Sequence, residues 1–467
     1  MAQPGKLAVH PKDLGPRFSI AALLGFNLAV KLLWLGVNDL SGDEPFTMYW
    51  SQRPWPDLKD MLLTEGRPPL HFLITRQWST LVPFEAAWIR VPSALFSALA
   101  VWPLFLIARK LGRDRMAWAC ALLFSFSNYQ FGCAHEASAH ALFTLLAIWS
   151  MWIVVREPGA PVVGWSGILA LALLNGLLTW VHPIGWLLVA MQSACMLVIP
   201  DLRAWRRAHL LSALITAALF APIAIICFTE AVSPVAGKAT ASAPVSDAID
   251  EVLRGWFNSP FLAAPFLFIL TVAAFRSRLR HSVLRLGVAW SFVPVLLLFA
   301  VNRWISVSVD WLLACAAPGF ALVVAASCEA LRIPASIHRF ALALAVLLML
   351  ITFHPWKAGG MRPSTVAEQV SAWCANDCHI EVVPTSYWLE YLAAEDIDLL
   401  RQDQEALLNS TPLLPDRKQA EAIGTYILVD ASADGEGAEV LNRLRTQFPR
   451  VEMASPDRAV RVYRFVH

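Results

Sequence analysis

Long apolar runs recur along most of this chain and constrain its fold more than any other feature. A run of about 20 residues with few charges is long enough to cross a bilayer as a helix. Hydrophobic residues make up 57% of the 467 residues and charged residues only 15%, whereas soluble proteins carry about 25% charged residues. The 20 Trp residues fit the aromatic belts at membrane surfaces. The sequence therefore predicts a mainly α, polytopic membrane protein.

About eleven segments have the length and hydropathy of spanning helices. They are expected at 18–40, 85–107, 116–134, 139–155, 162–180, 184–199, 210–228, 260–275, 286–301, 311–329 and 340–355. With residues 1–17 in the cytoplasm, the basic clusters between spans, such as Arg109-Lys110 and Arg206-Arg207, all fall on the cytoplasmic side, as the positive-inside rule requires. The shorter apolar stretch 68–82 is expected to be partly embedded or re-entrant.

The composition of residues 356–467 differs from that of the transmembrane part, 18–355, and predicts a small soluble α/β domain on the extracytoplasmic face. Strand-like runs occur at 380–383, 425–429 and 460–466, with helical stretches near 365–375 and 436–447. Two long outer loops, 41–84 and 229–259, are expected on the same face. Cys374 and Cys378 either pair there or stay reduced, because oxidising surroundings favour a disulfide and a four-residue helical spacing opposes it.

The net charge of +2 gives no reason to expect a nucleic-acid partner, since the basic residues are placed where they set topology. Asp43-Glu44 stands out instead, directly after the first span. Carboxylates near a membrane are costly unless they bind or catalyse something. Asp43 also precedes Pro45, so it either caps a helix that starts there or takes part in chemistry.

Two further motifs follow this acidic pair in order. Gly66-Arg67-Pro68-Pro69-Leu70-His71 opens the next apolar stretch, and Arg90-Val91-Pro92-Ser93-Ala94-Leu95-Phe96 begins the next span. With these three motifs, the chain resembles the GT-C superfamily of membrane glycosyltransferases. It looks most like the bacterial family 39 group, which is related to protein O-mannosyltransferases and lipid A aminoarabinose transferases. The resemblance covers residues 18–200 well and the remainder by layout.

The resemblance implies an inverting glycosyltransferase of the bacterial inner membrane. Such an enzyme moves a sugar from a polyprenyl-phosphate donor to a hydroxyl of a glycan, lipid or protein acceptor on the outer face. By resemblance, Asp43 is the general base for that hydroxyl, and Glu44 positions the base or the acceptor. Cations and dipoles are needed for the departing phosphate. The candidate substrate-binding residues are Arg67, His71, His135, Glu136, His140, His182 and Arg303.

Several of these candidates have a structural alternative. Arg67 either holds phosphate or sugar hydroxyls, or extends to lipid head groups. Arg303 either neutralises the donor phosphate or pairs with Asp310. Arg90 is expected to tie the first outer loop to its helix. Lys31, inside the first span, either marks function or extends to the surface. Lys238, in the loop 229–259, reaches phosphate or lies in a plain connector.

The chain also departs from the pattern of related enzymes. Ser138 stands where Arg is common and His140 where Tyr is common, so His135 and His140 are expected to substitute as donors when protonated. Asp310-Trp311 replaces a usual Arg-Tyr pair. No spacing typical of metal ligands is visible, so no metal or other cofactor is required.

Two other functions remain open at this point. A non-catalytic relative that acts as a partner subunit fits the departures at Ser138 and Asp310. A transporter of lipid or sugar is the second rival, but it predicts ionisable residues at mid-membrane and repeat-related, interrupted spans, whereas here the ionisable residues gather at one mouth.

Overall fold

The computed structural model describes most of the helical part of the chain and the secondary structure of the tail. The described residues are 17–38, 44–64, 66–83, 85–156, 163–231, 252–256, 258, 272, 282–301, 309–331, 334–352, 363–373, 378–383, 425–430, 436–457 and 460–466. The chain forms two compact units. The first comprises Met1–Leu35, Pro54–Leu81 and Arg90–His354, and the second Gly36–Arg53, Val82–Ile89 and Pro355–His467.

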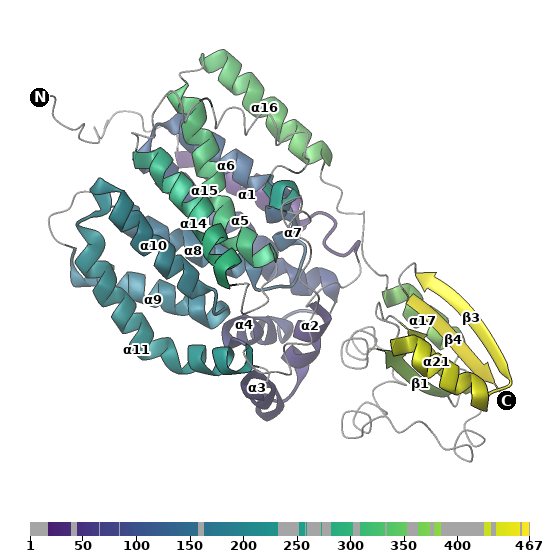
Figure 1. Cartoon of the computed structure of the whole chain (residues 1–467). Coiled ribbons are helices and arrows are strands. Elements are labelled where there is room, and N and C mark those ends of the chain that lie inside the picture. Colours follow the sequence, from purple (N-terminus) through teal and green to yellow (C-terminus); the bar gives the residue numbers. More distant parts are fainter. Residues whose placement is uncertain are drawn as a thin grey trace, which may run out of the picture. The chain divides into compact units, whose positions relative to one another are not determined.

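The first unit is a bundle of helices (Figure 1). In chain order these are α1 (Arg17–Leu32), α3 (Trp55–Thr64), α4 (Pro69–Ser79), α5 (Ala86–Leu111), α6 (Asp114–Ser125), α7 (Asn128–Ala134), α8 (His140–Val155), α9 (Trp165–Val181), α10 (Gly185–Val198), α11 (Trp205–Ala231), α14 (Ser282–Val301), α15 (Val309–Ala330) and α16 (Ala335–Thr352). Among the described residues, α5 and α16 have the length and hydropathy to cross a membrane, and several shorter helices are equally apolar. α16 runs along the outside of the bundle with most of its surface exposed.

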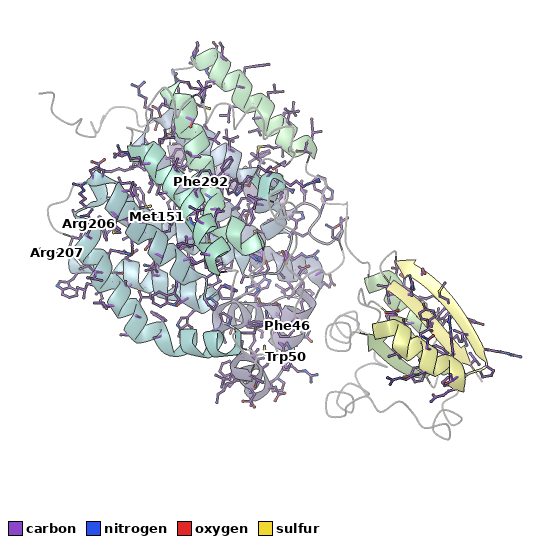
Figure 2. All side chains as sticks on the ribbon, in the orientation of Figure 1. Phe46, Trp50, Met151, Arg206, Arg207 and Phe292 are labelled. Carbon is purple, nitrogen blue, oxygen red and sulfur yellow. The ribbon has the colours of Figure 1, made fainter. Side chains whose placement is uncertain are left out.

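Most of the expected spans coincide with these helices. α8, α9 and α10 match the predicted segments to within a few residues, and α14, α15 and α16 are close to theirs. The stretch 68–82 contains the 11-residue helix α4. α11 begins five residues earlier than the predicted span, with Arg206 and Arg207 in its first turn (Figure 2). The predicted span 260–275 lies outside the described residues.

Two predicted spans were wrong in extent. The first was expected to reach residue 40, but α1 ends at Leu32 and Trp34 has a φ of 65°, a left-handed conformation in which an α-helix cannot continue. The predicted span 116–134 is two helices, α6 and α7. Ser127 caps α7, since its Oγ accepts a hydrogen bond of 3.3 Å from the backbone N–H of Gln130.

Asn258 holds this break between α6 and α7 from far away in the sequence. Its side-chain amide donates to the carbonyl oxygens of Phe126, at 3.1 Å, and Met349, at 3.0 Å. Its Oδ1 accepts a hydrogen bond of 2.6 Å from the backbone N–H of Asn128. Backbone groups that an uninterrupted helix would pair internally are therefore satisfied by one distant side chain.

The second unit contains α2 (Glu44–Gln52) and the α/β structure of the tail. The tail comprises α17 (Pro363–Trp373), β1 (Cys378–Val383), β2 (Thr425–Asp430), α21 (Glu436–Gln447), β3 (Arg450–Asp457) and β4 (Val460–Val466). The strands form one sheet in the order β1-β2-β4-β3. β1 and β2 are parallel, and β4 is antiparallel to both β2 and β3. α21 covers one face of the sheet, where Leu444 and Phe448 pack with Tyr426 and Phe465.

The predicted strands and helices of the tail were confirmed, but β3 was not expected. β3 is an edge strand, and its first residues are exposed, including Met453 at 61%. It also contains Pro456 near its end, which is tolerated at edges rather than in central strands. An exposed strand with mixed polarity gives only a weak periodic signal.

Two glycines allow α14 and α15 to pack with their backbones close together. A Cβ added at Gly319 on α15 would lie 2.6 Å from the Cβ of Trp290 and 2.8 Å from the backbone N of Ser291. A Cβ at Gly287 on α14 would lie 2.9 Å from the backbone N of Val323. Small residues let membrane helices approach closely in this way.

We expect Gly319→Ala to lower the free energy of unfolding by about 1–3 kcal/mol, the usual cost of overpacking against atoms that cannot move aside. Gly25→Ala on α1 is the control, because nothing lies within 4 Å of a Cβ at Gly25. The thermal midpoint of each purified variant in detergent gives the measurement. Equal midpoints for the two variants would contradict the close contact between α14 and α15.

Candidate functional site

Five polar residues gather where α4, α8 and α9 meet the loops beside them, and we call them the histidine cluster: Arg67, His71, Ser138, His140 and His182. Arg67 lies in the turn between α3 and α4. Gly66 there has a φ of 60°, a conformation that suits glycine, and the backbone N–H of Arg67 donates to Leu62 O at 3.0 Å. The turn thus places Arg67 directly before the Pro-Pro pair that starts α4.

His71 connects α4 to the turn between α7 and α8. It lies in the first turn of α4 and is 8% exposed. Its Nε2 donates to the carbonyl oxygen of Ala137 at 3.2 Å, and this bond assigns the ring proton to Nε2, since a carbonyl can only accept. The Pro-Pro motif and the 135–140 turn, distant in the sequence, are therefore adjacent in the fold.

Ser138 and His140 form a local pair in that turn. The Oγ of Ser138 and the Nδ1 of His140 are 2.8 Å apart, and both residues are buried. The backbone of Ser138 also approaches α5, where Ser93 Oγ donates to its carbonyl oxygen over 3.5 Å. The serine that replaces the usual Arg thus orients the neighbouring imidazole.

His182 follows the last residue of α9 and has an extended backbone. Its Nδ1 accepts a hydrogen bond of 3.2 Å from the backbone N–H of Ile184, so this nitrogen carries no proton. Burial, and then the nearby His140 and Arg67, lower the pKa of His182 from 6.5 to about 3. His182 is consequently neutral at physiological pH. Because the charges of His140 and Arg67 contribute to its lowered pKa, His182 lies near both of these members of the cluster.

A second group of polar residues lies around the end of α1. Arg90 is 1% exposed, and its guanidinium donates to the carbonyl oxygen of Leu35 at 2.6 Å. Burial, and then the charge of Arg90, lower the pKa of His135 from 6.5 to about 4. A buried imidazole beside a guanidinium loses its proton, so His135 would act as a protonated donor only at acidic pH, and its role in binding stays a prediction.

The remaining predicted residues are less fully placed. Glu44 is the first residue of α2 and is fully buried, and Glu136 is half-buried in the α7–α8 turn. Asp43, Lys238 and Arg303 lie outside the described residues. Asp310 is in α15, but its side chain is outside the described part of the structure. Among the described residues, no three His, Cys, Asp or Glu side chains converge in a way that could hold a metal ion.

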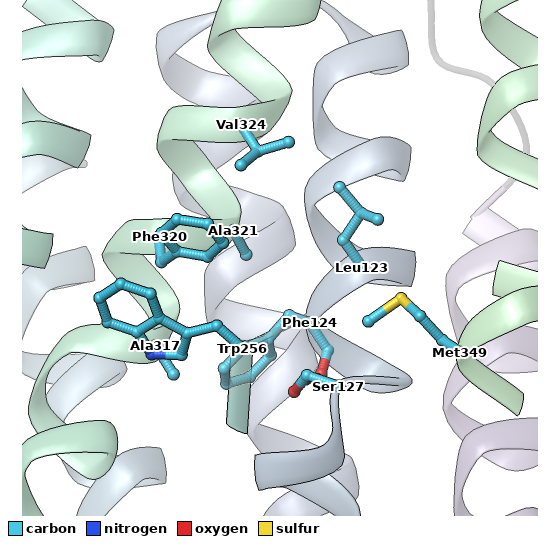
Figure 3. A pocket seen from close by; sticks show the side chains of 9 residues that line it. All are labelled: Leu123, Phe124, Ser127, Trp256, Ala317, Phe320, Ala321, Val324 and Met349. Atoms are coloured by element: carbon cyan, nitrogen blue, oxygen red, sulfur yellow. Dashed lines mark hydrogen bonds between the residues drawn. The ribbon is translucent and has the colours of Figure 1, made fainter. Parts of the chain in front are cut away.

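A small apolar pocket lies between α6, α15, α16 and the segment 252–256 (Figure 3). Trp256 stacks on Phe320 at one wall, with ring centroids 4.3 Å apart and planes at 13°. The other lining residues are Leu123, Phe124, Ser127, Ala317, Ala321, Val324 and Met349. None of them titrates near neutral pH, so this pocket suits an apolar group and the histidine cluster is the candidate for chemistry.

The residues that sequence reasoning missed are Ser93, Ser97, Gln130 and Asn258. Ser93 and Ser97 could have been found, because they follow Arg90 at helical spacing in an otherwise apolar span. Gln130 and Asn258 gave no local signal, since their partners are distant in the sequence.

Comparisons with known proteins identify the fold. No protein-family model and no curated protein sequence matches the chain. Among solved structures, ArnT from Cupriavidus metallidurans bound to undecaprenyl phosphate is similar, with a TM-score of 0.61 and 15% identity over 96% of this chain and 98% of that chain. ArnT in the apo state gives a TM-score of 0.58 with the same identity and coverage. The oligosaccharyltransferase from Archaeoglobus fulgidus, in complex with Zn and sulfate, is a weaker match, with a TM-score of 0.48 and 12% identity over 80% of this chain and 61% of that chain.

The chain has a GT-C fold. ArnT, a lipid A aminoarabinose transferase, belongs to the GT-C superfamily, so the resemblance suggested by the three sequence motifs is confirmed at the level of the fold. Multi-pass membrane proteins share this fold. Together with the apolar helices, it supports a membrane location for this chain.

We expect His182 to make the GT-C fold sensitive to acid. Between pH 6.5 and about 3, the unfolded chain binds a proton at His182 that the folded protein does not. Stability is therefore lost as pH falls through this window, by up to about 1.4 kcal/mol per pH unit. His182→Asn keeps an acceptor for the Ile184 N–H and does not titrate, so its thermal midpoint should fall less between pH 6.5 and 4 than that of the unaltered protein. Parallel curves for the two proteins would contradict the neutral, buried state of His182.

Proposed function

We propose that this protein is an inverting glycosyltransferase that moves a sugar from a polyprenyl-phosphate donor to a hydroxyl on a glycan, lipid or protein acceptor. The main support is the match to ArnT bound to undecaprenyl phosphate, which covers 96% of this chain and 98% of ArnT. The second support is the histidine cluster, which brings residues of separate motifs together on three helices of that fold. The proposed site faces the outside of the bacterial inner membrane, with the N-terminus in the cytoplasm and the tail domain outside.

In the proposed reaction, the acceptor oxygen attacks the anomeric carbon of the donor sugar. The bond from that carbon to the phosphate oxygen breaks, and its electron pair leaves with the lipid phosphate. Asp43 takes the proton of the acceptor hydroxyl, which raises the nucleophilicity of the oxygen as the new bond forms. Glu44 positions the base or the acceptor. Attack from the face opposite the phosphate inverts the anomeric centre.

The leaving phosphate gains negative charge beside a low-dielectric bilayer, so it needs a fixed cation. Arg67 is the permanently charged member of the histidine cluster, and we assign it to the phosphate, with Arg303 as a second cation. His71, His135, Glu136, His140 and His182 shape the pocket and bind sugar hydroxyls. Burial lowers the pKa values of His135 and His182, and a neutral imidazole suits this role because it can donate and accept hydrogen bonds at once.

The purified protein is expected to transfer a radiolabelled sugar from a polyprenyl-phosphate donor to an acceptor extract, and Asp43→Asn should reduce the rate by about 10²–10⁴-fold, the usual contribution of a general base. Asp60→Asn is the matched control, since Asp60 is an exposed acidic residue of α3 in the same outer loop. Transfer at the normal rate by the Asp43 variant would remove the base assignment. No transfer by the unaltered protein with any donor would favour a non-catalytic relative or a transporter.

Arg67 should act on the donor rather than on the acceptor. We expect Arg67→Gln to raise the KM for the donor about tenfold or more, because a charge-assisted hydrogen bond is worth about 1.5–3 kcal/mol. Arg67→Lys should recover part of the loss, since it keeps the charge but not the planar fork. Initial rates at varied donor and acceptor concentrations give the measurement. An unchanged KM for the donor in Arg67→Gln would exclude the phosphate role.

A further inference from the structure

A lysine ammonium lies fully buried inside the helical unit. Lys31 is in the last turn of α1 and is 0% exposed, which excludes the alternative that it extends to the membrane surface. Its Nζ donates to Ser97 Oγ at 2.8 Å and to the side-chain oxygen of Gln130 at 3.4 Å. Within the described part of the chain, no carboxylate lies within ion-pair distance of this ammonium. A buried lysine held only by neutral groups is costly to charge, and its position calls for an explanation.

The partners of Lys31 hold one another as well. Ser97 is on α5 and Gln130 on α7, and both are buried. Ser97 Oγ lies 2.9 Å from the backbone carbonyl oxygen of Gln130, to which it can donate, and it also contacts the Gln130 side-chain oxygen. A single junction thus joins α1, α5 and α7 through the side chains of Lys31, Ser97 and Gln130.

Side chains on the face of α5 that carries Ser97 also contact the segments on either side of this junction. Ser93 and Ser97 follow Arg90 by three and seven residues, so all three side chains lie on one side of the helix. Arg90 binds the carbonyl oxygen of Leu35, just beyond Lys31, at 2.6 Å. Ser93 contacts the carbonyl oxygen of Ser138 at 3.5 Å. The outer end of α1 and the turn that carries part of the histidine cluster are therefore both attached to the helix that Lys31 joins.

His135 adds an independent link between these segments. Burial, and then the charges of Arg90 and Lys31, lower the pKa of its ring, so the ring lies within electrostatic range of both side chains. The α7–α8 turn, which begins at His135, therefore lies near the last turn of α1. A shift of either segment would disturb the other.

We propose that Lys31 is a positioning residue, whose buried ammonium, held by Ser97 and Gln130, fixes the outer end of α1 relative to the turn 135–140. Asp43 follows Leu35 by eight residues in the sequence, and His140 belongs to the histidine cluster. The kinetic effect of Lys31 rests on the proposed transferase function, whereas its effect on the two segments does not. Lysine suits this task because its ammonium offers three donors on a stem long enough to reach two helices.

The test compares Lys31→Met, which keeps the apolar stem and removes the donors, with Asn27→Leu. Asn27 is the matched control because it is fully buried one turn earlier on α1 and makes no hydrogen bond among the described residues. In Lys31→Met, we expect amide hydrogen exchange to rise at residues 33–38 and 131–139, and kcat for sugar transfer to fall about 100-fold, the usual result of a displacement of about 1 Å. The KM for the donor should stay within about threefold of normal, because Lys31 touches no substrate. Asn27→Leu should leave exchange and kcat unchanged.

A second variant separates positioning from stability. Lys31→Met combined with Gln130→Leu replaces the polar contact with an apolar one, which is often neutral or stabilising, so its thermal midpoint should approach that of the unaltered protein. We expect kcat to remain low in the double variant. Recovery of kcat together with the midpoint would show that Lys31 is only structural and would overturn the proposal. If the unaltered protein transfers no sugar, the proposed transferase function fails. Hydrogen exchange alone then tests the role of Lys31, and unchanged exchange at both segments in Lys31→Met would overturn that role.

Discussion

The hydrogen-bonding demand of polar groups in an apolar interior organises this protein. Each helix leaves backbone groups unpaired at its ends, and a membrane interior supplies no water to satisfy them. The chain meets this demand with a few side chains that each serve several segments. Arg90 binds the carbonyl oxygen of Leu35, in the turn beyond α1. Asn258 satisfies groups on three residues of the α6–α7 break and α16. These contacts set where the helices end, and the ends set where the loops with the candidate site residues begin.

Close backbone contact complements these polar contacts. Gly287 and Gly319 bring α14 and α15 together by removing side chains from the interface. Elsewhere the helices are joined by amides and hydroxyls: Asn175 and Gln192 exchange hydrogen bonds of 3.0 and 3.2 Å between α9 and α10, and Gln192 also donates to Ser150 on α8 at 2.9 Å. In a bilayer, packing and interhelical hydrogen bonds provide the specificity that the hydrophobic effect gives in water.

The sequence predicted what depends on local pattern and missed what depends on distant partners. α8, α9, α10 and most strands of the tail follow from hydropathy and periodicity, and they were found close to their predicted positions. The break at Phe126 could not be predicted in this way, since its partner Asn258 is 132 residues away. The sequence singled out Arg67, His71, His140 and His182 in separate motifs, and the structure places them near one another; their role in binding stays a prediction. The pKa of His135 could not be inferred from the sequence, because it depends on burial and on the nearby Arg90, neither of which a sequence pattern reveals.

The protonation of the histidines changes how the departure at Ser138 must be understood. In related enzymes an Arg is common at this position, and a protonated histidine nearby was expected to replace its charge. Burial and neighbouring cations instead lower the pKa values of His182 to about 3 and His135 to about 4, so neither adds positive charge at neutral pH. The Ser138 Oγ lies 2.8 Å from His140 Nδ1. This hydrogen bond orients the imidazole, but the hydroxyl has no charge that could neutralise an anion. Within the histidine cluster, Arg67 is the residue with a permanent positive charge that can neutralise an anionic ligand. Its fixed place in the turn before α4, set by the left-handed backbone of Gly66, is the feature of the cluster on which recognition of a phosphate would depend most.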